Sequence, residues 1–364
     1  MRWSFLIFKF KGIGVKVHLT FLLVLIWAAY SWSIELGKGW RGALFGIVAI
    51  TLLFLSVVLH EFGHSLTAIK YGAKVKEITL LPIGGVSQIE SLPEDPKQEF
   101  KIAIIGPLIN FAIVTILWFV VGFLFKFRVI THFAELKLIV GQISWRGMLF
   151  YLIFANLILG LFNLIPAFPM DGGRVLRSLL AMKMNYLKAT RRAVLIGEII
   201  AIILGLWGFM FSNFFLVLIA FFVFFGATQE GRQVELKTAL KRIIVEEAYS
   251  KNIQILAPDD PIAKAITLSL HSFQSDFPVI QEGRVVGILT KTEILSGVHK
   301  HHPQIPVAQV MRRDFQIASP GDSLFDIQQK MADKRLSAVP VVEKGTLLGL
   351  LTLEDINEAY RLLA

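Results

Sequence analysis

Long apolar runs fill the first two thirds of the chain and are absent from the last third. Runs close to twenty residues with few charges recur between residues 17 and 230, whereas residues 231–364 resemble an ordinary soluble sequence. A helix rises about 1.5 Å per residue, so about twenty apolar residues are needed to cross the hydrocarbon of a bilayer. The pattern therefore predicts a polytopic α-helical membrane protein followed by a soluble α/β domain. The six predicted spans are 17–33, 42–69, 101–124, 147–166, 190–210 and 213–229.

The N-terminus and the loop charges predict how these spans are oriented. Residues 1–16 are basic and then hydrophobic, and no small-residue cleavage site follows, so we expect a retained first span rather than a signal peptide. Six spans place both termini on one side. Fifteen lysines and arginines fall on that side and six on the other. Because basic loops stay inside, we expect a multi-pass cell-membrane protein with a cytoplasmic N-terminus and a cytoplasmic soluble domain.

One segment between the second and third spans does not have a helical pattern. Residues 74–90 alternate, carry β-branched side chains and are interrupted by Pro82-Ile83-Gly84-Gly85, which predicts a short hairpin or re-entrant segment. Non-helical backbone near a membrane is tolerated only where it is buried in protein or lines a wet cavity. The segment is therefore a candidate wall of an active site.

The soluble part contains an internal repeat. Residues 245–300 match residues 307–362 at a constant offset of 62 without a gap, and Pro278-Val279 pairs with Pro340-Val341. Such self-similarity indicates two copies of one supersecondary unit, each with the pattern helix, strand, turn, strand, helix. The expected domains are a membrane domain at 1–230, a linker at 231–244, and repeat copies at 245–302 and 303–364.

Composition limits the partners and the metal chemistry. The net charge of +10 lies mainly beside apolar runs, where it fits lipid head groups. No compact basic cluster with interleaved aromatics occurs, so we expect no nucleic-acid partner. The chain has no cysteine, which excludes disulfides and thiolate ligands. A zinc site here must use histidine and carboxylate donors.

The second predicted span ends with the pentapeptide His60-Glu61-Phe62-Gly63-His64. Histidines four residues apart share one face of a helix and can bind one ion. Zinc lowers the pKa of its water to about 7, and Glu61 is placed to accept the proton as the water attacks a peptide carbonyl. The alternative is a polar helix interface without metal. Ionisable residues inside a span are costly and usually face a functional interior, which favours the metal.

A catalytic zinc of this kind needs a third protein ligand. Asp171 is the best candidate, because the prolines at 166 and 169 stop the fourth span and the glycines at 172 and 173 allow an irregular turn. The alternative is that Asp171 only caps the following helix. Its predicted depth, close to that of His60 and His64, favours the ligand role.

HEFGH in an early span and NLIPAFPMDGGR in a later one resemble the site-2 protease family of intramembrane metalloproteases, over residues 1 to about 230. The resemblance implies one Zn²⁺ per chain, held by His60, His64 and Asp171, with Glu61 as the catalytic glutamate.

The same resemblance extends to residues that would contact the substrate. Asn163 matches the asparagine of the pattern N-x-x-P-x-x-P-x-D-G and suits a substrate carbonyl or a developing oxyanion. Asn110, in Gly106-Pro107-Leu108-Ile109-Asn110, is a further substrate-contact candidate, with a helix–helix hydrogen bond as the alternative. Gly84 and Gly85 resemble a loop feature of the family and are expected to contact the substrate.

The tandem repeat resembles a pair of CBS domains, which bind adenine nucleotides (ATP, ADP or AMP) between the copies. The resemblance places Thr290 with Glu293, and Thr352 with Asp355, at phosphate and ribose. Asp355 matches the pattern, whereas Glu293 is a longer substitute. The alternative is a structural pair without ligand. Paired CBS modules also dimerise, so a homodimer is expected.

We therefore expect a zinc endopeptidase that cuts transmembrane segments of membrane-protein substrates within the bilayer (regulated intramembrane proteolysis) and is modulated by adenine nucleotide. An alternative is a CBS-gated transporter or channel with a cation site at His60, His64 and Asp171. A third interpretation, a membrane scaffold for the nucleotide module, predicts no metal. Glu61 discriminates between the first two, because a transport site needs no general base.

Overall fold

The computed structural model describes residues 3–89, 93–125, 142–272, 274–300 and 303–363. Contacts between Cα atoms divide the chain into two compact units, Met1–Gly231 and Arg232–Ala364. The elements of the first unit are β1 (Ser4–Phe10), β2 (Ile13–His18), α1 (Phe21–Tyr30), a π-helical turn (Ser31–Glu35), α2 (Gly39–Lys70), β3 (Val75–Leu81), β4 (Gly84–Ile89), α3 (Pro96–Phe125), α5 (Trp145–Asn163), α6 (Asp171–Ala181), α7 (Tyr186–Met210) and α8 (Phe214–Leu240).

Five helices of the described residues are long and apolar enough to cross a membrane: α2, α3, α5, α7 and α8. They match the second to sixth predicted spans. Residues 231–240, which the sequence pattern assigns to a linker, continue α8. Three of the basic residues counted on the non-cytoplasmic side, Lys126, Arg128 and Lys137, lie outside the described residues.

The first predicted span, 17–33, is a shorter apolar helix than the other five. Residues 4–18 form the hairpin β1–β2, so only residues 17 and 18 of the predicted span belong to a strand. Together α1 and the π-helical turn cover residues 21–35, about 22 Å at 1.5 Å per residue. The other five apolar helices have 19 residues or more.

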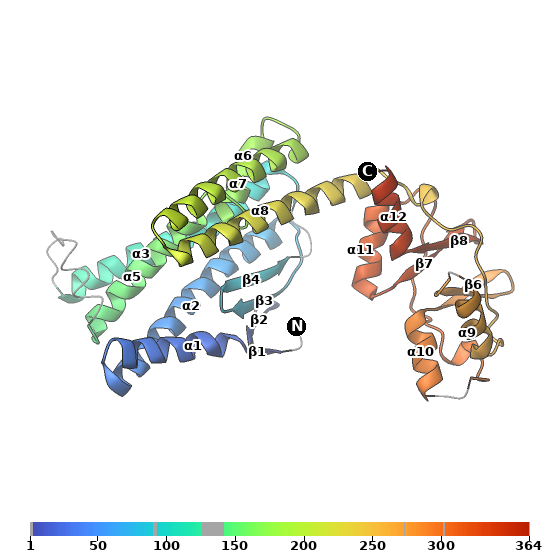
Figure 1. Ribbon diagram of the computed structural model, residues 1–364, viewed down its shortest axis with the longest axis horizontal. Helices are drawn as coiled ribbons and strands as arrows, with labels where there is room; N and C mark the ends of the chain where they lie inside the picture. Colours follow the sequence, from blue (N-terminus) through green and yellow to red (C-terminus); the bar gives the residue numbers. More distant parts are fainter. Residues whose placement is uncertain (1–2, 90–92, 126–141, 273, 301–302, 364) are drawn as a thin grey trace. The chain divides into compact units, whose positions relative to one another are not determined.

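A four-stranded sheet in the order β1-β2-β3-β4 packs against α2 (Figure 1). Strands β2 and β3 are parallel, with Val15 beside Ile78, and the outer pairs are antiparallel. The hairpin β3–β4 confirms the prediction for residues 74–90. Apolar residues of β2 and β3, such as Val15 and Leu80, join Phe54 and Val57 of α2 in one buried cluster. The sheet is thereby fixed beside the helix that carries the pentapeptide.

The second unit contains the two repeat copies, each with the predicted order of elements. They are a 3-10 turn (Val245–Glu247), α9 (Ile262–His271), β5 (Phe277–Gln281), β6 (Arg284–Leu289) and α10 (Lys291–Lys300), then a 3-10 turn (Val307–Gln309), α11 (Leu324–Lys334), β7 (Ala338–Glu343), β8 (Thr346–Thr352) and α12 (Leu353–Leu363). The copies are intertwined. Ser250, which precedes the first copy's hairpin, bridges to Leu350 of the second, and Arg312 bridges back to Ile288 of the first.

Candidate metal centre

His60, His64 and Asp171 converge on one point. The Nε2 atoms of the two histidines are 3.0 Å apart, and each lies 3.1 Å from Oδ2 of Asp171. Both histidines are more than nine-tenths buried. Among the described residues this is the group of histidine and carboxylate side chains that could hold a metal ion.

The triangle of donor atoms fits zinc. Tetrahedral zinc with bonds of about 2.0–2.1 Å separates its donors by about 3.3 Å. The observed edges of 3.0–3.1 Å differ from that by only about 0.3 Å. Two imidazoles and one carboxylate also form a known catalytic donor set, which leaves a fourth position open. The donor chemistry therefore suits a catalytic rather than a closed structural ion.

Local structure explains how the three donors meet. His60 and His64 lie one turn apart on α2, and Asp171 is the first residue inside α6. The capping alternative is not what the structure shows, because Met170 occupies the cap position and the Asp171 carboxylate faces the histidines. Burial would raise the pKa of Asp171, but the charges and hydrogen bonds of His64 and His60 lower it below its ordinary value. The carboxylate is thus kept in the ionised form that a metal needs.

Helix α3 passes directly behind the donors and holds both imidazoles. Nδ1 of His64 lies 2.6 Å from the carbonyl oxygen of Ile102, and Nδ1 of His60 lies 2.5 Å from Oδ1 of Asn110. Gly106 lies between these contacts, and a Cβ there would be 2.6 Å from Nε2 of His60 and closer still to that of His64. The helix can approach the metal centre this closely only because residue 106 has no side chain.

Glu61 lies on α2 beside the donors and is held by the sheet. Oγ of Ser87, on β4, donates a hydrogen bond of 2.5 Å to its Oε2. Gly85 also packs against Glu61, since a Cβ at Gly85 would lie 2.7 Å from the glutamate Cγ. Sequence reasoning included Gly85 but missed Ser87, a common residue in a strand with no pattern to mark it.

Gly84 lines an apolar groove, and Asn163 follows Phe162, another residue of its lining. Asn163 is the last residue of α5, and its side chain makes no hydrogen bond to any part of the chain that the structure describes. Gly84 begins β4 and lines a groove of about 440 Å³ with Ile83, with Val57 of α2 and with several residues of α5. Because Val57 also lies against Gly85, this groove leads to Glu61.

A second buried polar cluster lies behind α6. Arg177 is only 2% exposed and donates to Glu99 of α3 at 2.8 Å and to Glu230 of α8 at 2.7 Å. Its guanidinium also lies over the rings of Phe168 and Tyr186. Burial opposes the charge, but the neighbouring Glu99 raises the pKa of Arg177, so the side chain stays cationic. From the sequence this arginine contributed only to the count of basic residues.

The four predicted nucleotide residues form two separate local pairs in the second unit. Thr352 donates to Asp355 from its amide and its hydroxyl, at 2.8 and 2.7 Å, at the start of α12. Thr290 donates to Glu293 in the equivalent position at the start of α10. The Thr352–Asp355 pair caps α12, because the amide of Asp355 also donates to the Thr352 hydroxyl. Asp355 also accepts a hydrogen bond from Ser250.

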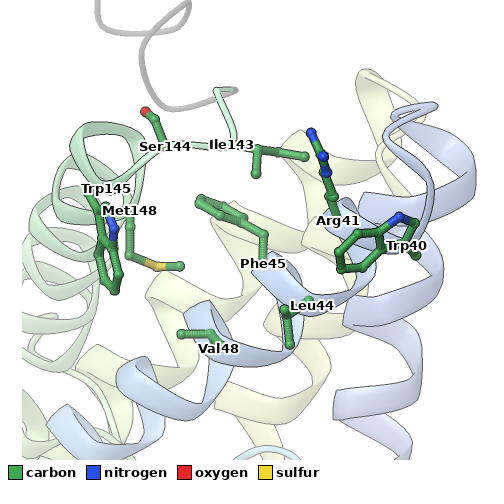
Figure 2. A pocket seen from close by; sticks show the side chains of 9 residues that line it. All are labelled: Trp40, Arg41, Leu44, Phe45, Val48, Ile143, Ser144, Trp145 and Met148. Carbon is green, nitrogen blue, oxygen red and sulfur yellow. The ribbon is translucent and has the colours of Figure 1, made fainter.

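Another hollow, of about 360 Å³, lies at the N-terminal ends of α2 and α5. Figure 2 shows Trp40 and Arg41 on one side of it and Trp145 and Met148 on the other, with Phe45 between them. Its deepest residue on α2, Val48, precedes His60 by twelve positions, about 18 Å along a helix. The hollow has no histidine or carboxylate in its lining, so it is not the candidate catalytic cleft.

A membrane-spanning bundle that buries a His–His–Asp donor set beside a glutamate defines the class of the protein as a membrane-embedded metallopeptidase. The peptidase family M50 model matches residues 48–206, and the CBS domain model matches residues 245–300 and 307–362. The chain is 36% identical to zinc metalloprotease MJ0392 of Methanocaldococcus jannaschii, over 100% of this chain and 98% of that protein. This chain belongs to peptidase family M50.

Two further similarities were found. Stage IV sporulation protein FB of Bacillus subtilis is 26% identical over 57% of this chain and 66% of that protein. Among solved structures, the site-2 protease from Methanocaldococcus jannaschii is 42% identical, covers 63% of this chain and 95% of that chain, and has a TM-score of 0.45.

Both predicted resemblances, to the site-2 protease family and to CBS domains, are confirmed. The protein is a multi-pass intramembrane zinc metalloendopeptidase with a CBS pair. The alternatives of a transporter or channel and of a metal-free scaffold are wrong, because family M50 consists of peptidases.

Proposed function

We propose that the protein hydrolyses peptide bonds within transmembrane segments of other membrane proteins, with His60, His64 and Asp171 as zinc ligands and Glu61 as general base. The observation that supports this proposal is the meeting of the three donors within 3.1 Å of one another, inside a bundle of membrane-length helices. Zinc bound there would acidify its water and polarise the scissile carbonyl.

The two carboxylate oxygens of Glu61 have different roles in the proposed proton transfer. Ser87 occupies Oε2 of Glu61, which leaves Oε1 to accept the proton of the attacking water. The same oxygen then returns the proton to the leaving amine. Asn163 is proposed to donate to the carbonyl oxygen of the cleaved bond, since its amide has no other partner within the described residues.

The apolar groove and strand β4 offer a path for the substrate. The groove is lined by apolar residues of α2 and α5, which suits the side chains of a transmembrane segment. Strand β4 is an outer strand of the sheet, so its free edge can pair with an unwound substrate and satisfy that backbone in a dry site. Gly84 and Gly85 would let the substrate backbone approach closely. We therefore propose that the substrate is cut in an extended conformation beside β4.

Glu61→Gln tests the assignment. Purified wild-type protein and the variant are reconstituted with a single-span membrane-protein substrate, and cleavage and zinc content are both measured. Cleavage should vanish while one zinc per chain remains, and Glu246→Gln, at an exposed site in the soluble unit, should cleave normally. Wild-type protein that is folded but holds no zinc, or a Glu61→Gln variant that still cleaves, would refute the proposal.

We further propose that the CBS pair binds an adenine nucleotide at Thr352–Asp355 and, with the longer Glu293, at Thr290–Glu293, and that binding modulates cleavage. Asp355→Ala should weaken ATP, ADP or AMP binding, measured by calorimetry on the full chain. Equal binding by the wild type and by a variant altered at both pairs would exclude these sites. A structural pair would bind no nucleotide at all.

The proposed orientation has a cytoplasmic N-terminus and a cytoplasmic CBS pair, with the shorter apolar helix Phe21–Glu35 crossing the bilayer as the first of six spans. The proposed assembly is a homodimer through the CBS domains. Because the chain lacks cysteine, single cysteines report sidedness cleanly. Leu270→Cys, at a residue 77% exposed in the soluble unit, should react with an impermeant maleimide only from the cytoplasmic side, and Trp40→Cys, 71% exposed, only from the other. Light scattering of the detergent complex would measure the number of chains.

A further inference from the structure

Three polar side chains from three helices form a buried chain of hydrogen bonds behind the metal centre. Asn110 of α3 and Asn156 of α5 are fully buried, and Ser56 of α2 is 7% exposed. Asn110 donates from Nδ2 to Oδ1 of Asn156 at 3.0 Å, and Asn156 donates from Nδ2 to the Leu152 carbonyl at 2.9 Å and to Ser56 at 3.2 Å. At its other end the chain reaches Nδ1 of His60.

The Leu152 carbonyl, where this series of hydrogen bonds ends, determines the donor and the acceptor of each bond. A backbone carbonyl only accepts, so the amide nitrogen of Asn156 must face Leu152 and its oxygen must face Asn110. Asn110 then presents its nitrogen to Asn156 and its oxygen to His60. That oxygen requires a proton on Nδ1 of His60, which leaves Nε2 with the free lone pair that faces Asp171.

We propose that Asn156 is a positioning residue for the metal centre: it fixes the direction of the Asn156–Asn110 relay and thereby the tautomer in which His60 offers Nε2 to the metal. His64 obtains the same result directly, because its Nδ1 faces the Ile102 carbonyl. Among the described residues, Nδ1 of His60 contacts the Asn110 side chain instead of a backbone carbonyl. The amide groups of Asn110 and Asn156 connect it to the Leu152 carbonyl, which has the same effect on the position of the proton. Partners of this kind orient metal-bound histidines and raise their affinity.

The relay predicts different zinc affinities after substitution of Asn156 and of Ser56, although both side chains are buried. Asn156→Leu removes the acceptor of Asn110, so that amide can turn over and present its nitrogen to His60. Nδ1 would then lose its proton to Nε2, and zinc affinity should fall about 10–100-fold. Ser56→Ala removes only a side branch, because Leu152 still orients Asn156. That variant should keep wild-type affinity.

A second substitution should restore what Asn156→Leu removes. An aspartate at position 110 has two accepting oxygens, so it requires a proton on Nδ1 of His60 whatever residue 156 is. The double variant Asn110→Asp/Asn156→Leu should therefore regain most of the zinc affinity. A merely structural role for Asn156 predicts no such rescue, because the double variant removes one more native side chain.

The experiment measures zinc affinity of the full-length chain in detergent, by competition with a chromogenic chelator, for the wild type and the three variants. It is combined with ¹⁵N NMR of the histidine side chains in metal-free wild type, which needs no variant to fold. A weakened Asn156→Leu, an unchanged Ser56→Ala and a rescued double variant, with His60 protonated at Nδ1, are expected. Equal affinities throughout, equal losses in Asn156→Leu and Ser56→Ala, absence of rescue, or wild-type His60 protonated at Nε2 would each overturn the proposal.

The inference rests on the proposed ligand role of His60, and the two can fail separately. If wild-type protein binds no zinc, the proposed function fails. If wild type binds zinc but the variants behave as just described for an overturned relay, only the role of Asn156 fails.

Discussion

Gly106→Ala should destroy the metal centre, although alanine favours the helical conformation of α3, where residue 106 lies. A Cβ at residue 106 would lie 2.6 Å from Nε2 of His60 and nearer to Nε2 of His64. A carbon and a nitrogen that are not bonded need about 3.5 Å, so the His60 ring would have to retreat by about 0.9 Å and the His64 ring by more. Metal–ligand distances tolerate changes of only about 0.2 Å.

The rings cannot retreat without losing other contacts. Asn110 and the Ile102 carbonyl hold their Nδ1 atoms at 2.5 and 2.6 Å. We therefore expect zinc affinity to fall by at least about 100-fold and cleavage to be lost. On helix propensity alone, the same substitution would stabilise α3 by about 1 kcal/mol, so a folded but zinc-free protein is expected.

Chelator competition and a cleavage assay on the reconstituted protein measure both effects. Gly122→Ala is the matched control, because it lies on the same helix and a Cβ there meets no atom within 4 Å. It should bind zinc and cleave like the wild type. A Gly106→Ala protein with wild-type zinc affinity would refute the placement of α3 behind the donors.

Three further predictions follow from contacts described above. Ser87→Ala frees Oε2 of Glu61, and loss of a hydrogen bond to a charged group, worth about 1.5–3 kcal/mol, should lower kcat about 10–100-fold with zinc content unchanged. Arg177→Met leaves buried Glu99 and half-buried Glu230 without their cation and should lower the free energy of unfolding by about 3–5 kcal/mol, measured by denaturant titration. Gly349→Ala places a Cβ 2.5 Å from the Tyr249 ring and should destabilise the CBS pair by about 1–3 kcal/mol, measured by hydrogen exchange of β8.

Each of these predictions has a control that separates it from general damage. Ser87→Thr keeps the hydroxyl and should recover kcat. Adding Glu99→Gln to Arg177→Met removes one of the stranded carboxylates and should recover part of the stability. A Cβ at Gly321 would meet no atom within 4 Å, so hydrogen exchange of β8 in Gly321→Ala should equal that of the wild type. Unchanged kcat, unchanged unfolding or unchanged exchange in the three principal variants would contradict the corresponding contact.

The sequence predicts those parts of the fold and site that short-range patterns determine. Five apolar runs became α2, α3, α5, α7 and α8, and the spacing of His60 and His64 sufficed to place two donors on one helical face. The strand β1 was missed because it is apolar on both faces and lies beside an apolar run. Its sheet is completed only by β3, about sixty residues later in the chain, and no local pattern predicts such a pairing.

The missed residues share one cause, which is that their roles depend on partners from other elements. Ser87 gains its role from Glu61 on α2, and Arg177 from carboxylates on α3 and α8. Asn156 did leave a signal, since an asparagine within an apolar span is costly unless it is bonded. Its partner Asn110, 46 residues away, could not be identified from spacing.

Helix α8 continues through the boundary between the two units, which falls after Gly231. Near its middle, Gly226 packs on Pro169 of the loop before Asp171, and Glu230 binds Arg177. Nearly three turns beyond Glu230, Leu240 is buried in the core of the second CBS copy. The family models leave this helix unassigned, because one ends at residue 206 and the other begins at residue 245.

A junction placed between the two matched regions would therefore cut a continuous helix, in which each amide donates to the carbonyl four residues before it. Exchanging the CBS pair between relatives would need a joining segment that stays helical, and a proline inside it would cost about 3 kcal/mol.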